Sequence, residues 1–303
     1  MSSSSVKPVG TPVTFSGDSA IFSRCSKFVA RISLSCEYLL RRVRESIDRN
    51  RAALKAVELV PRFLLGEFEP ALATTLFGVD YKAPFGIAPV GLTGLMWPGA
   101  ERILARTAAR YRVPIGLSTV ATESVETIGP MAQGMGWFQL YPPRDKAIRK
   151  DLLARASAAG FTTLLVTADV PIGSRRERQA HAQVSVPPRK TWQSYLRAAL
   201  RPAWSLATLE RGLPRFRTLE KYANTSDMQQ IALFVQQQLG GTLSWEYLEE
   251  IRDEWPGPIV VKGILHPDDA LRSADIGMDG VVISTHGGRQ FDGAPASIDA
   301  LPE

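Results

Sequence analysis

Short apolar runs rich in Val, Ile and Leu recur along the chain from residue 84 onward, and segments with helical periodicity separate them. Runs that are apolar at almost every position are typical of strands buried on both faces, as in parallel sheets with crossover helices. The predicted strands cover 84–91, 114–120, 136–141, 162–169, 258–263 and 280–285. The pattern therefore predicts an α/β fold in which strands and helices alternate.

The intervening segments repeat their apolar residues at helical spacing. Ser244 is a predicted N-cap, and Pro267 with two following aspartates is typical of a first helical turn. Ahead of the first strand, residues 37–56 place apolar side chains on one face and arginines on the other, which predicts an amphipathic helix. The predicted helices cover 37–56, 100–112, 145–160, 227–239, 244–255 and 266–277.

Two segments do not follow this alternation. Residues 170–257 are too long for a plain strand-to-helix connection, so we expect a long loop excursion on the side of the strand C-termini. Residues 1–36 are Ser-rich and poor in acidic residues, which indicates a disordered segment or a leader, with a transit peptide as the alternative. We expect residues 37–303 to form one domain.

Composition narrows the class of protein. The chain has 303 residues, 45% hydrophobic and 22% charged, which excludes collagen-like, coiled-coil and wholly disordered proteins. No apolar run reaches the ~18 residues of a membrane-spanning helix. Cys25 and Cys36 have neither zinc-ligand spacing nor a disulfide framework around them, which favours a reducing, cytoplasmic compartment. With three histidines in the chain, we expect no His-rich metal site.

The net charge of +6 is concentrated in residues 1–56 and 175–221. Such patches are compatible with nucleic acid, anionic lipid or an acidic substrate. No zinc-finger or RNA-binding signature accompanies them, so we expect no nucleic-acid partner. Residues 189–204 mix cations with Trp192, Tyr195 and Trp204, a combination that suits a lipid interface. The alternative is a lid whose aromatic side chains pack on the domain.

The predicted strands end in polar or backbone-permissive residues. Parallel strands bring these ends to one edge, which is where (β/α)₈ barrels place their active sites. Six such ends in register therefore predict a TIM-type barrel with a site at that edge. The residues are Ala88, Pro89, Val90, Ser118, Gln139, Tyr141, Thr167, Asp169, Lys262 and Ser284, with His286 and Arg289 directly after the last strand.

These residue types favour one reaction class. His286 is a candidate general base, and Asp169 can orient its ring and stabilise its charged form. Arg176 and Arg289 suit a substrate carboxylate, because guanidinium binds carboxylates in bidentate fashion. Tyr141 can hydrogen-bond a substrate, and Lys262 can stabilise negative charge on a cofactor ring. Taken singly, each has a structural explanation: a helix-capping histidine, solvated arginines, a lysine in an ion pair, an aspartate in a turn.

The string STHGGRQFDGAPASIDALP (284–302) resembles the signature of the FMN-dependent α-hydroxy-acid dehydrogenases and oxidases. Supporting strings occur in the family's order: APVGLTG (88–94), LSTVA (117–121), WFQLY (137–141), TADVPIGSRRER (167–178) and SWEYLEEIRDEWPGPIVVKGI (244–264). The resemblance implies a flavin barrel that oxidises an L-2-hydroxy acid to the 2-oxo acid. Val120 stands where glycolate oxidases have tryptophan, which favours the lactate dehydrogenase branch.

Residue by residue, the resemblance implies that His286 is the base, that Asp169 is its partner and that Tyr141 orients the substrate. Arg176 and Arg289 would hold the substrate carboxylate. It implies that FMN is contacted by Ala88, Pro89, Val90, Ser118, Gln139, Thr167, Lys262 and Ser284. The electron acceptor stays open between oxygen, a quinone and a cytochrome. We expect a cytoplasmic protein that is peripheral at the inner face of the membrane if 189–204 binds lipid, and homo-oligomers are compatible with the sequence.

Two departures from the family pattern bear on function. Residues 37–50 lack the Gly-Gly-Ala loop that normally follows an N-terminal tyrosine, for which Tyr38 is the candidate equivalent. The chain also ends 18 residues after the sixth predicted strand, so six of eight strands are expected and the last two βα units, which hold the FMN phosphate, are missing. The alternative function is therefore a non-catalytic barrel fragment or an interaction module.

Overall fold

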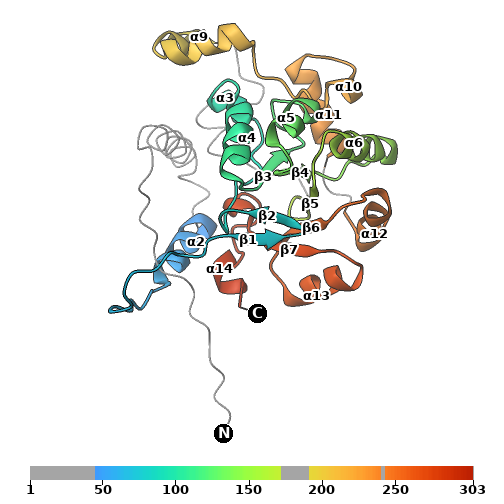
Figure 1. Cartoon of the computed structure of the whole chain (residues 1–303). Coiled ribbons are helices and arrows are strands. Elements are labelled where there is room, and N and C mark those ends of the chain that lie inside the picture. The colour runs from blue at the N-terminus through green and yellow to red at the C-terminus, as the bar shows by residue number, and fades with distance from the viewer. Residues whose placement is uncertain (1–44, 172–190, 240–242, 303) are drawn as a thin grey trace.

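A five-stranded parallel sheet forms the centre of the protein, as a computed structural model of residues 45–171, 191–239 and 243–302 shows (Figure 1). The strands lie in chain order and confirm five of the six predicted strands. They are β3 (Ile115–Ser118), β4 (Gly136–Leu140), β5 (Thr163–Thr167), β6 (Ile259–Ile264) and β7 (Gly280–Ile283). Every residue of β5 is buried, as expected of a strand covered on both faces.

The first predicted strand, 84–91, is wrong as a full strand. Ile87 alone makes a bridge with Ile115, supported by Ile87 N donating to the Pro114 carbonyl and Gly116 N donating to the Ile87 carbonyl, each over 2.8 Å. Pro84 and Pro89 have no N–H to donate, and this prevents a continuous ladder. The segment therefore lies beside β3 as extended backbone.

Helices follow the strands around the outside of the sheet (Figure 1). The predicted helices are confirmed as α4 (Ala100–Tyr111), α6 (Lys146–Ala158), α12 (Trp245–Glu254) and α13 (Pro267–Asp275). Ser244 caps α12 as predicted, with its hydroxyl accepting from Tyr247 N. Helix α5 (Val125–Ala132) was not predicted, because it contains Gly129 and Pro130. A Cβ at Gly129 would lie 2.1 Å from the Ala159 carbonyl oxygen, so the glycine permits close packing at this point.

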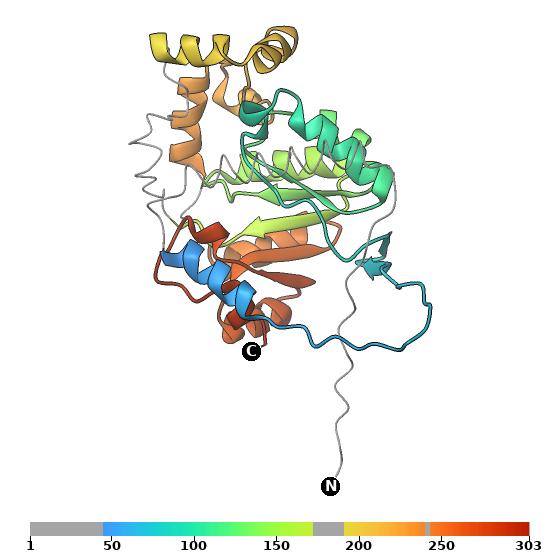
Figure 2. The same cartoon turned by 90° about the vertical axis from the view of Figure 1, so that its left-hand side faces the viewer.

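The excursion between β5 and β6 is largely helical in its described part. It contains α8 (Trp192–Ala199), α9 (Pro202–Arg211), α10 (Glu220–Ala223), α11 (Met228–Gln238) and α12. Helix α11 confirms the helix predicted for 227–239, and Asp227 caps it. Helix α9 lies at an extremity of the molecule in both views (Figures 1 and 2). The described residues of this excursion, 191–239 and 243–257, are therefore largely helical.

The N-terminal part of the described chain begins with α2 (Glu45–Ala56), which confirms that part of the predicted helix. Of its predicted apolar face, Ile47 lies against Gly288, whereas Leu54 is 61% exposed. An extended segment, 57–73, leads to a hairpin of β1 (Thr74–Leu76) and β2 (Val79–Tyr81). The short elements are α3 (Thr93–Met96), the 3₁₀ turn η1 (His286–Gly288) and α14 (Ser297–Ala300). The expected leader, 1–36, lies outside the described residues.

A buried arginine joins the helices on either side of β5. Arg149 of α6 is 1% exposed and hydrogen-bonds to Glu254 over 2.6 and 2.7 Å and to Glu250 over 2.8 Å, both on α12. Its guanidinium carbon lies 4.4 Å from the ring centroid of Tyr247. Burial alone would lower the pKa of Arg149, but the hydrogen bonds to Glu254 and Glu250 raise it above its ordinary value. The charge is therefore retained inside the fold.

Replacing this arginine should destabilise the protein measurably. We expect Arg149→Met to lower the free energy of unfolding by about 2–3 kcal/mol, because Glu254, whose side chain is 14% exposed, loses its charged partner. Lys150→Met is the control, since its amine lies 3.9 Å from Glu254 and its side chain is 67% exposed, for which about 0.5 kcal/mol is expected. Urea denaturation measures both, and equal effects would contradict a special role for Arg149.

Candidate active site

Polar side chains from neighbouring strands meet at the carboxyl edge of the sheet. The register aligns Ser118 with Gln139 and Thr167 with Lys262, so adjacent strands end at the same level. Asp169 follows β5 by two residues, and Ser284 follows β7 directly. The parallel pairing thus brings together residues that are separated by more than a hundred positions in the sequence.

His286 and Asp169 form a short polar contact at this edge. The Nδ1 atom of His286 lies 2.6 Å from the Oδ1 atom of Asp169, and the side chains are 15% and 11% exposed. A carboxylate only accepts hydrogen bonds, so Nδ1 carries the proton and Nε2 keeps its lone pair. The hydroxyl of Tyr141 lies 3.3 Å from Nε2 and can donate to it. The ring is therefore arranged to accept a proton at Nε2.

Lys262 binds the second oxygen of the same carboxylate. Its Nζ atom lies 3.3 Å from Asp169 Oδ2 and 3.2 Å from the hydroxyl oxygen of Ser284. The lysine side chain is 15% exposed. One carboxylate therefore lies between an ammonium group and an imidazole and contacts both of them.

Gly263 makes room for Asp169 in this arrangement. Its φ of +106° falls where side chains are disfavoured, and the register of β6 and β7 shifts between Lys262 and Ile264. A Cβ at this position would lie 2.4 Å from the Cβ of Asp169. The irregularity of β6 therefore directs Lys262 toward the site and admits the carboxylate beside it.

The loop after β7 carries His286 in an unusual backbone conformation. His286, Gly287 and Gly288 have φ values of +53°, +63° and +67° in succession. The Ser284 hydroxyl accepts from His286 N over 3.0 Å, and Arg289 Nη1 donates to the His286 carbonyl over 3.3 Å. Local hydrogen bonds on both sides of the histidine thus fix its position relative to the strand end.

A second row of polar groups crosses β3, β4 and β5. The Ser118 hydroxyl donates to Gln139 Oε1 over 2.6 Å, and Gln139 Nε2 donates to the Thr167 hydroxyl over 2.7 Å. All three side chains are buried. Thr119, which the sequence analysis did not identify, donates to the Gln139 carbonyl and accepts from Tyr141 N. Thr119 therefore fixes the end of β4, which carries the central residue of this row, Gln139.

The remaining predicted residues are placed unequally. Ala88, Pro89 and Val90 lie in the extended segment beside β3, where a Cβ at Gly116 would lie 2.7 Å from Pro89 Cδ. Val90 is 49% exposed, and its carbonyl accepts from the Thr93 hydroxyl. Arg176 lies outside the described residues. The structure thus brings His286, Asp169, Tyr141, Lys262 and Ser284 together, with Arg289 next to the histidine.

Helix α2 contacts the His286 loop, a contact that was not predicted from the sequence. Asn50 Nδ2 lies 3.2 Å from the hydroxyl oxygen of Thr285, the residue before His286. The one available signal was an asparagine in the interior of a predicted helix, where its side chain competes with the backbone for hydrogen bonds.

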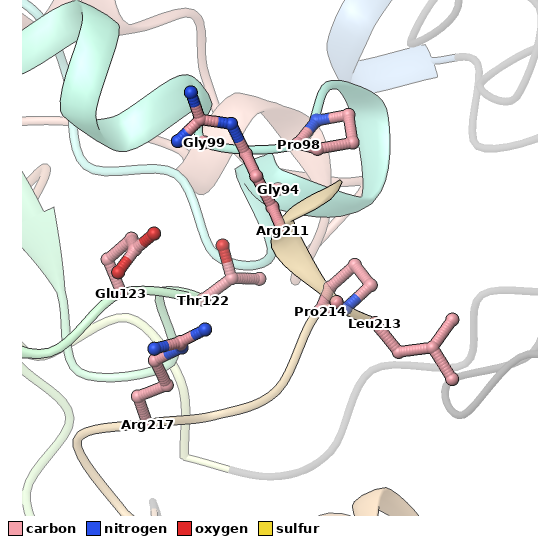
Figure 3. A pocket seen from close by; sticks show the side chains of 10 residues that line it. Gly94, Pro98, Gly99, Thr122, Glu123, Arg211, Leu213, Pro214 and Arg217 are labelled. Atoms are coloured by element: carbon pink, nitrogen blue, oxygen red, sulfur yellow. The ribbon is translucent and has the colours of Figure 1, made fainter. Parts of the chain in front are cut away.

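A small pocket lies elsewhere, between the start of α4 and the segment after α9 (Figure 3). Its lining includes Thr122, Glu123, Arg211 and Arg217, and it shares no residue with the His286 cluster. Arg102 donates two hydrogen bonds, of 2.7 and 3.0 Å, to the Glu123 carboxylate. Among the described residues, no group of three or more His, Cys, Asp or Glu side chains is placed to bind a metal ion.

Sequence comparison identifies close relatives. The family of FMN-dependent dehydrogenases matches residues 40–303. An L-lactate dehydrogenase of Caulobacter vibrioides is 41% identical over 259 residues, which are 85% of this chain and 67% of the relative. An L-lactate dehydrogenase of Pseudomonas aeruginosa is 39% identical over 271 residues, which are 88% of this chain and 68% of the relative. The chain thus spans about two thirds of the length of these relatives.

Solved structures agree with these matches. The crystal structure of (S)-mandelate dehydrogenase, described as a monotopic membrane protein, matches with a TM-score of 0.79 at 32% identity. The match covers 84% of this chain and 68% of that one. A mandelate oxidase matches with a TM-score of 0.67 at 31% identity, covering 85% of this chain and 65% of that one. The parallel sheet therefore has the arrangement found in these α/β barrel enzymes.

The placement of Asp169 by Gly263 can be tested through the imidazole of His286. We expect Gly263→Ala to displace the carboxylate, so that His286 loses its fixed proton at Nδ1 and the nitrogen signals of its ring move toward a tautomer mixture. NMR of protein labelled with ¹⁵N-histidine measures this, and the chain has only three histidines to assign. His266 is an internal reference of the opposite tautomer, because its Nδ1 accepts from Asp268 N.

Gly160→Ala is the matched control for this experiment. Gly160 has a φ of +89°, so alanine carries a similar backbone strain there, yet nothing lies within 4 Å of the added Cβ. The control should lose stability and leave the His286 signals unchanged. Unchanged His286 signals in Gly263→Ala would show that the bulge of β6 does not place Asp169.

Proposed function

The chain belongs to the FMN-dependent dehydrogenases, and from this premise we propose that it oxidises a lactate-like L-2-hydroxy acid to the 2-oxo acid. The observation that carries the proposal is the His286–Asp169 pair at the carboxyl edge of the sheet, with Tyr141 at the free Nε2. L-Lactate dehydrogenases at 41% and 39% identity support a lactate-like substrate. A non-catalytic fragment or interaction module is not favoured by these findings.

The residues present suit the flavin ring of FMN. The edge of that ring alternates hydrogen-bond donors and acceptors, and Ser118, Gln139 and Thr167 form a buried row that can supply both. Lys262 adds a positive charge beside this row, where it would stabilise negative charge on a reduced ring. The backbone of 88–90 lies next to β3 and would support the ring from that side. Bound FMN would supply the acceptor for the hydride that leaves the substrate carbon.

The chain's own residues handle the proton. His286 Nε2 is the proposed acceptor of the substrate hydroxyl proton, because Nδ1 is already bonded to Asp169. Asp169 then stabilises the imidazolium that forms and holds the ring in one orientation. Breaking the substrate O–H and C–H bonds yields the carbonyl of the 2-oxo acid, with the proton on His286 and the hydride removed.

The substrate carboxylate needs a cationic partner in the same space. Arg289 follows the catalytic loop and is tied to the His286 carbonyl, which places a guanidinium close to the base. Guanidinium groups bind carboxylates through paired hydrogen bonds, so Arg289, together with Arg176, is the proposed carboxylate site. Tyr141, 3.3 Å from His286 Nε2, would orient the hydroxyl group that loses its proton.

Replacing the base tests this function. We expect His286→Asn to reduce the rate of flavin reduction by L-lactate by about 10²–10⁴-fold, while FMN stays bound. Asparagine tolerates the left-handed backbone of this position, so the loss reports the missing base and not a distorted loop. Stopped-flow absorbance of the flavin measures the rate, and the absorbance of the filtered protein measures bound FMN.

His266→Asn is the control, because His266 caps α13 at the surface with a side chain that is 65% exposed. It should leave the rate unchanged. Flavin reduction by L-lactate at the normal rate in His286→Asn would remove this histidine from the mechanism. If the unchanged protein binds FMN but none of several L-2-hydroxy acids reduces it, the proposed function itself is contradicted.

Helices α8 and α9 present an apolar and basic surface, and we propose that it binds a membrane from one side. Trp192, Tyr195 and Leu200 are 72%, 64% and 70% exposed, and the neighbouring Arg197 and Arg201 are exposed. Such a mixture is favourable where aromatic rings lie at headgroup level and cations meet anionic lipid. The third aromatic, Trp204, instead packs inward and donates to the Leu95 carbonyl over 3.3 Å. Trp204 therefore attaches the surface to α3.

This position fits the other findings on membrane contact. No helix in the described part of the chain is long and apolar enough to cross a membrane. The (S)-mandelate dehydrogenase of similar fold is described as monotopic, which means that it enters the membrane from one side. A one-sided contact through α8 and α9 would be compatible with an electron acceptor in the membrane.

Vesicle binding tests this surface. We expect the protein to sediment with vesicles that contain phosphatidylglycerol at low salt, and the double variant Trp192→Ser/Leu200→Ser to bind about tenfold or more weakly, because large exposed apolar groups are lost. Leu271→Ser on α13 is the matched control, since Leu271 is 67% exposed on another part of the surface. Binding that is equal in all three proteins, or absent in the unchanged protein, would exclude the surface.

A further inference from the structure

Helix α2 lies directly on the loop that carries His286. A Cβ at Gly288 would lie 2.9 Å from Ile47 Cγ1 and 3.1 Å from Ile47 N, so the glycine permits the backbones to approach. Ser46 N donates to Asp292 Oδ1 over 3.0 Å, and Arg49 Nη1 donates to the carbonyls of Asp292 and Ala294. The two segments are about 240 residues apart in the sequence, as the bond between Ser46 and Asp292 illustrates.

The loop needs support from outside because its backbone is strained. A left-handed conformation costs a residue other than glycine roughly 1–2 kcal/mol, and His286 has a φ of +53°. Such conformations persist where surrounding contacts determine them. Thr285 provides one such contact: its hydroxyl accepts from Gly288 N over 3.3 Å and so closes the turn around the histidine.

Asn50 joins this hydroxyl to the helix and to the chain beyond the loop. Its Nδ2 donates to Thr285 Oγ1 over 3.2 Å and to the Ser46 carbonyl over 2.6 Å. Its Oδ1 accepts from Ser297 N, at the first residue of α14, over 3.1 Å. A single amide therefore connects α2 with both ends of the segment 285–297, on either side of the strained turn.

From these contacts we infer that Asn50 is a positioning residue for the proposed base His286, acting through the hydroxyl of Thr285. It touches neither substrate nor cofactor. It holds the turn in the one conformation that keeps His286 Nδ1 against Asp169. The inference rests on the proposed function for its kinetic readout, while its spectroscopic readout is independent of that function.

The principal variant is Asn50→Leu. Leucine has a similar size and a higher helix propensity than asparagine, so α2 itself is not weakened. The hydrogen bonds of the amide to Ser46, Thr285 and Ser297 are all lost. We expect the rate of flavin reduction to fall about 10–100-fold at saturating substrate, because a displacement on the order of 1 Å of a catalytic group has an effect of this size. The ¹⁵N signals of the His286 ring should move as well, while those of His266 stay in place.

Lys55→Leu is the control on the same helix, since Lys55 is exposed in the last turn of α2. It should change neither the rate nor the histidine signals. Thr285→Val should reproduce the defect of Asn50→Leu, and Thr285→Ser, which keeps the hydroxyl, should restore most of the rate. Asn50→Leu combined with Thr285→Val should be little worse than either single variant, because both break the same connection.

A positioning role predicts a lowered rate with bound FMN, a folded protein and a KM within about threefold of normal. Effects of Asn50→Leu and Thr285→Val that simply add, or a rate that falls only in proportion to folded protein, would overturn the inference. Unmoved His286 signals in Asn50→Leu would overturn it even if no 2-hydroxy acid proved to be a substrate. Inactivity of the unchanged protein with moved signals in the variant would contradict the proposed function alone.

Discussion

The parallel register of β3 to β7 is the constraint on which the candidate site depends. Each strand brings its carboxyl end to the same edge, so a shift of one residue would turn the aligned side chains to the opposite face. The register is supported by the burial of interior strands such as β5, and by Arg149, which links helices α6 and α12. The positions of the side chains at the carboxyl edge therefore depend on packing in the interior of the sheet and between its helices.

Charge balance is the second constraint, and it concentrates on one carboxylate. Asp169 is shared by Lys262 and His286, so a single negative charge lies between two groups that carry or can acquire positive charge. Hydrogen bonds with both groups fix the orientation of this carboxylate. The position of the imidazole therefore depends on the same side chain that holds the ammonium group of Lys262.

Much of this architecture could be predicted from the sequence, for physical reasons that particular elements illustrate. Apolar runs such as the one that forms β5 have no alternative to burial, and Ser244 marks the start of α12 by its capping chemistry. Helix α5 was not predicted because Gly129 and Pro130 have low helix propensity. In the structure, Gly129 permits close packing against the Ala159 carbonyl. The segment 84–91 was predicted as a strand because apolarity outweighed its two prolines.

The site shows the same division. His286, Asp169 and Lys262 were predicted because strand ends converge whatever the details of the loops. The contacts of Asn50 and the space provided by Gly263 were not, since both depend on distances between segments that no local pattern encodes. Local propensity identifies which residues can carry out the chemistry. Tertiary contact decides how accurately they are held.

The left-handed turn at 286–288 changes what the string His-Gly-Gly-Arg can report. Its two glycines are required by the backbone conformation. At Gly287 and Gly288 a side chain would be strained, and at Gly288 it would also clash with α2. A related chain that had lost catalytic activity but kept the fold would still need both glycines. Only the histidine and the arginine carry information about reaction. For catalysis, the string is therefore diagnostic only through His286 and Arg289, whereas Gly287 and Gly288 indicate the backbone conformation of the turn.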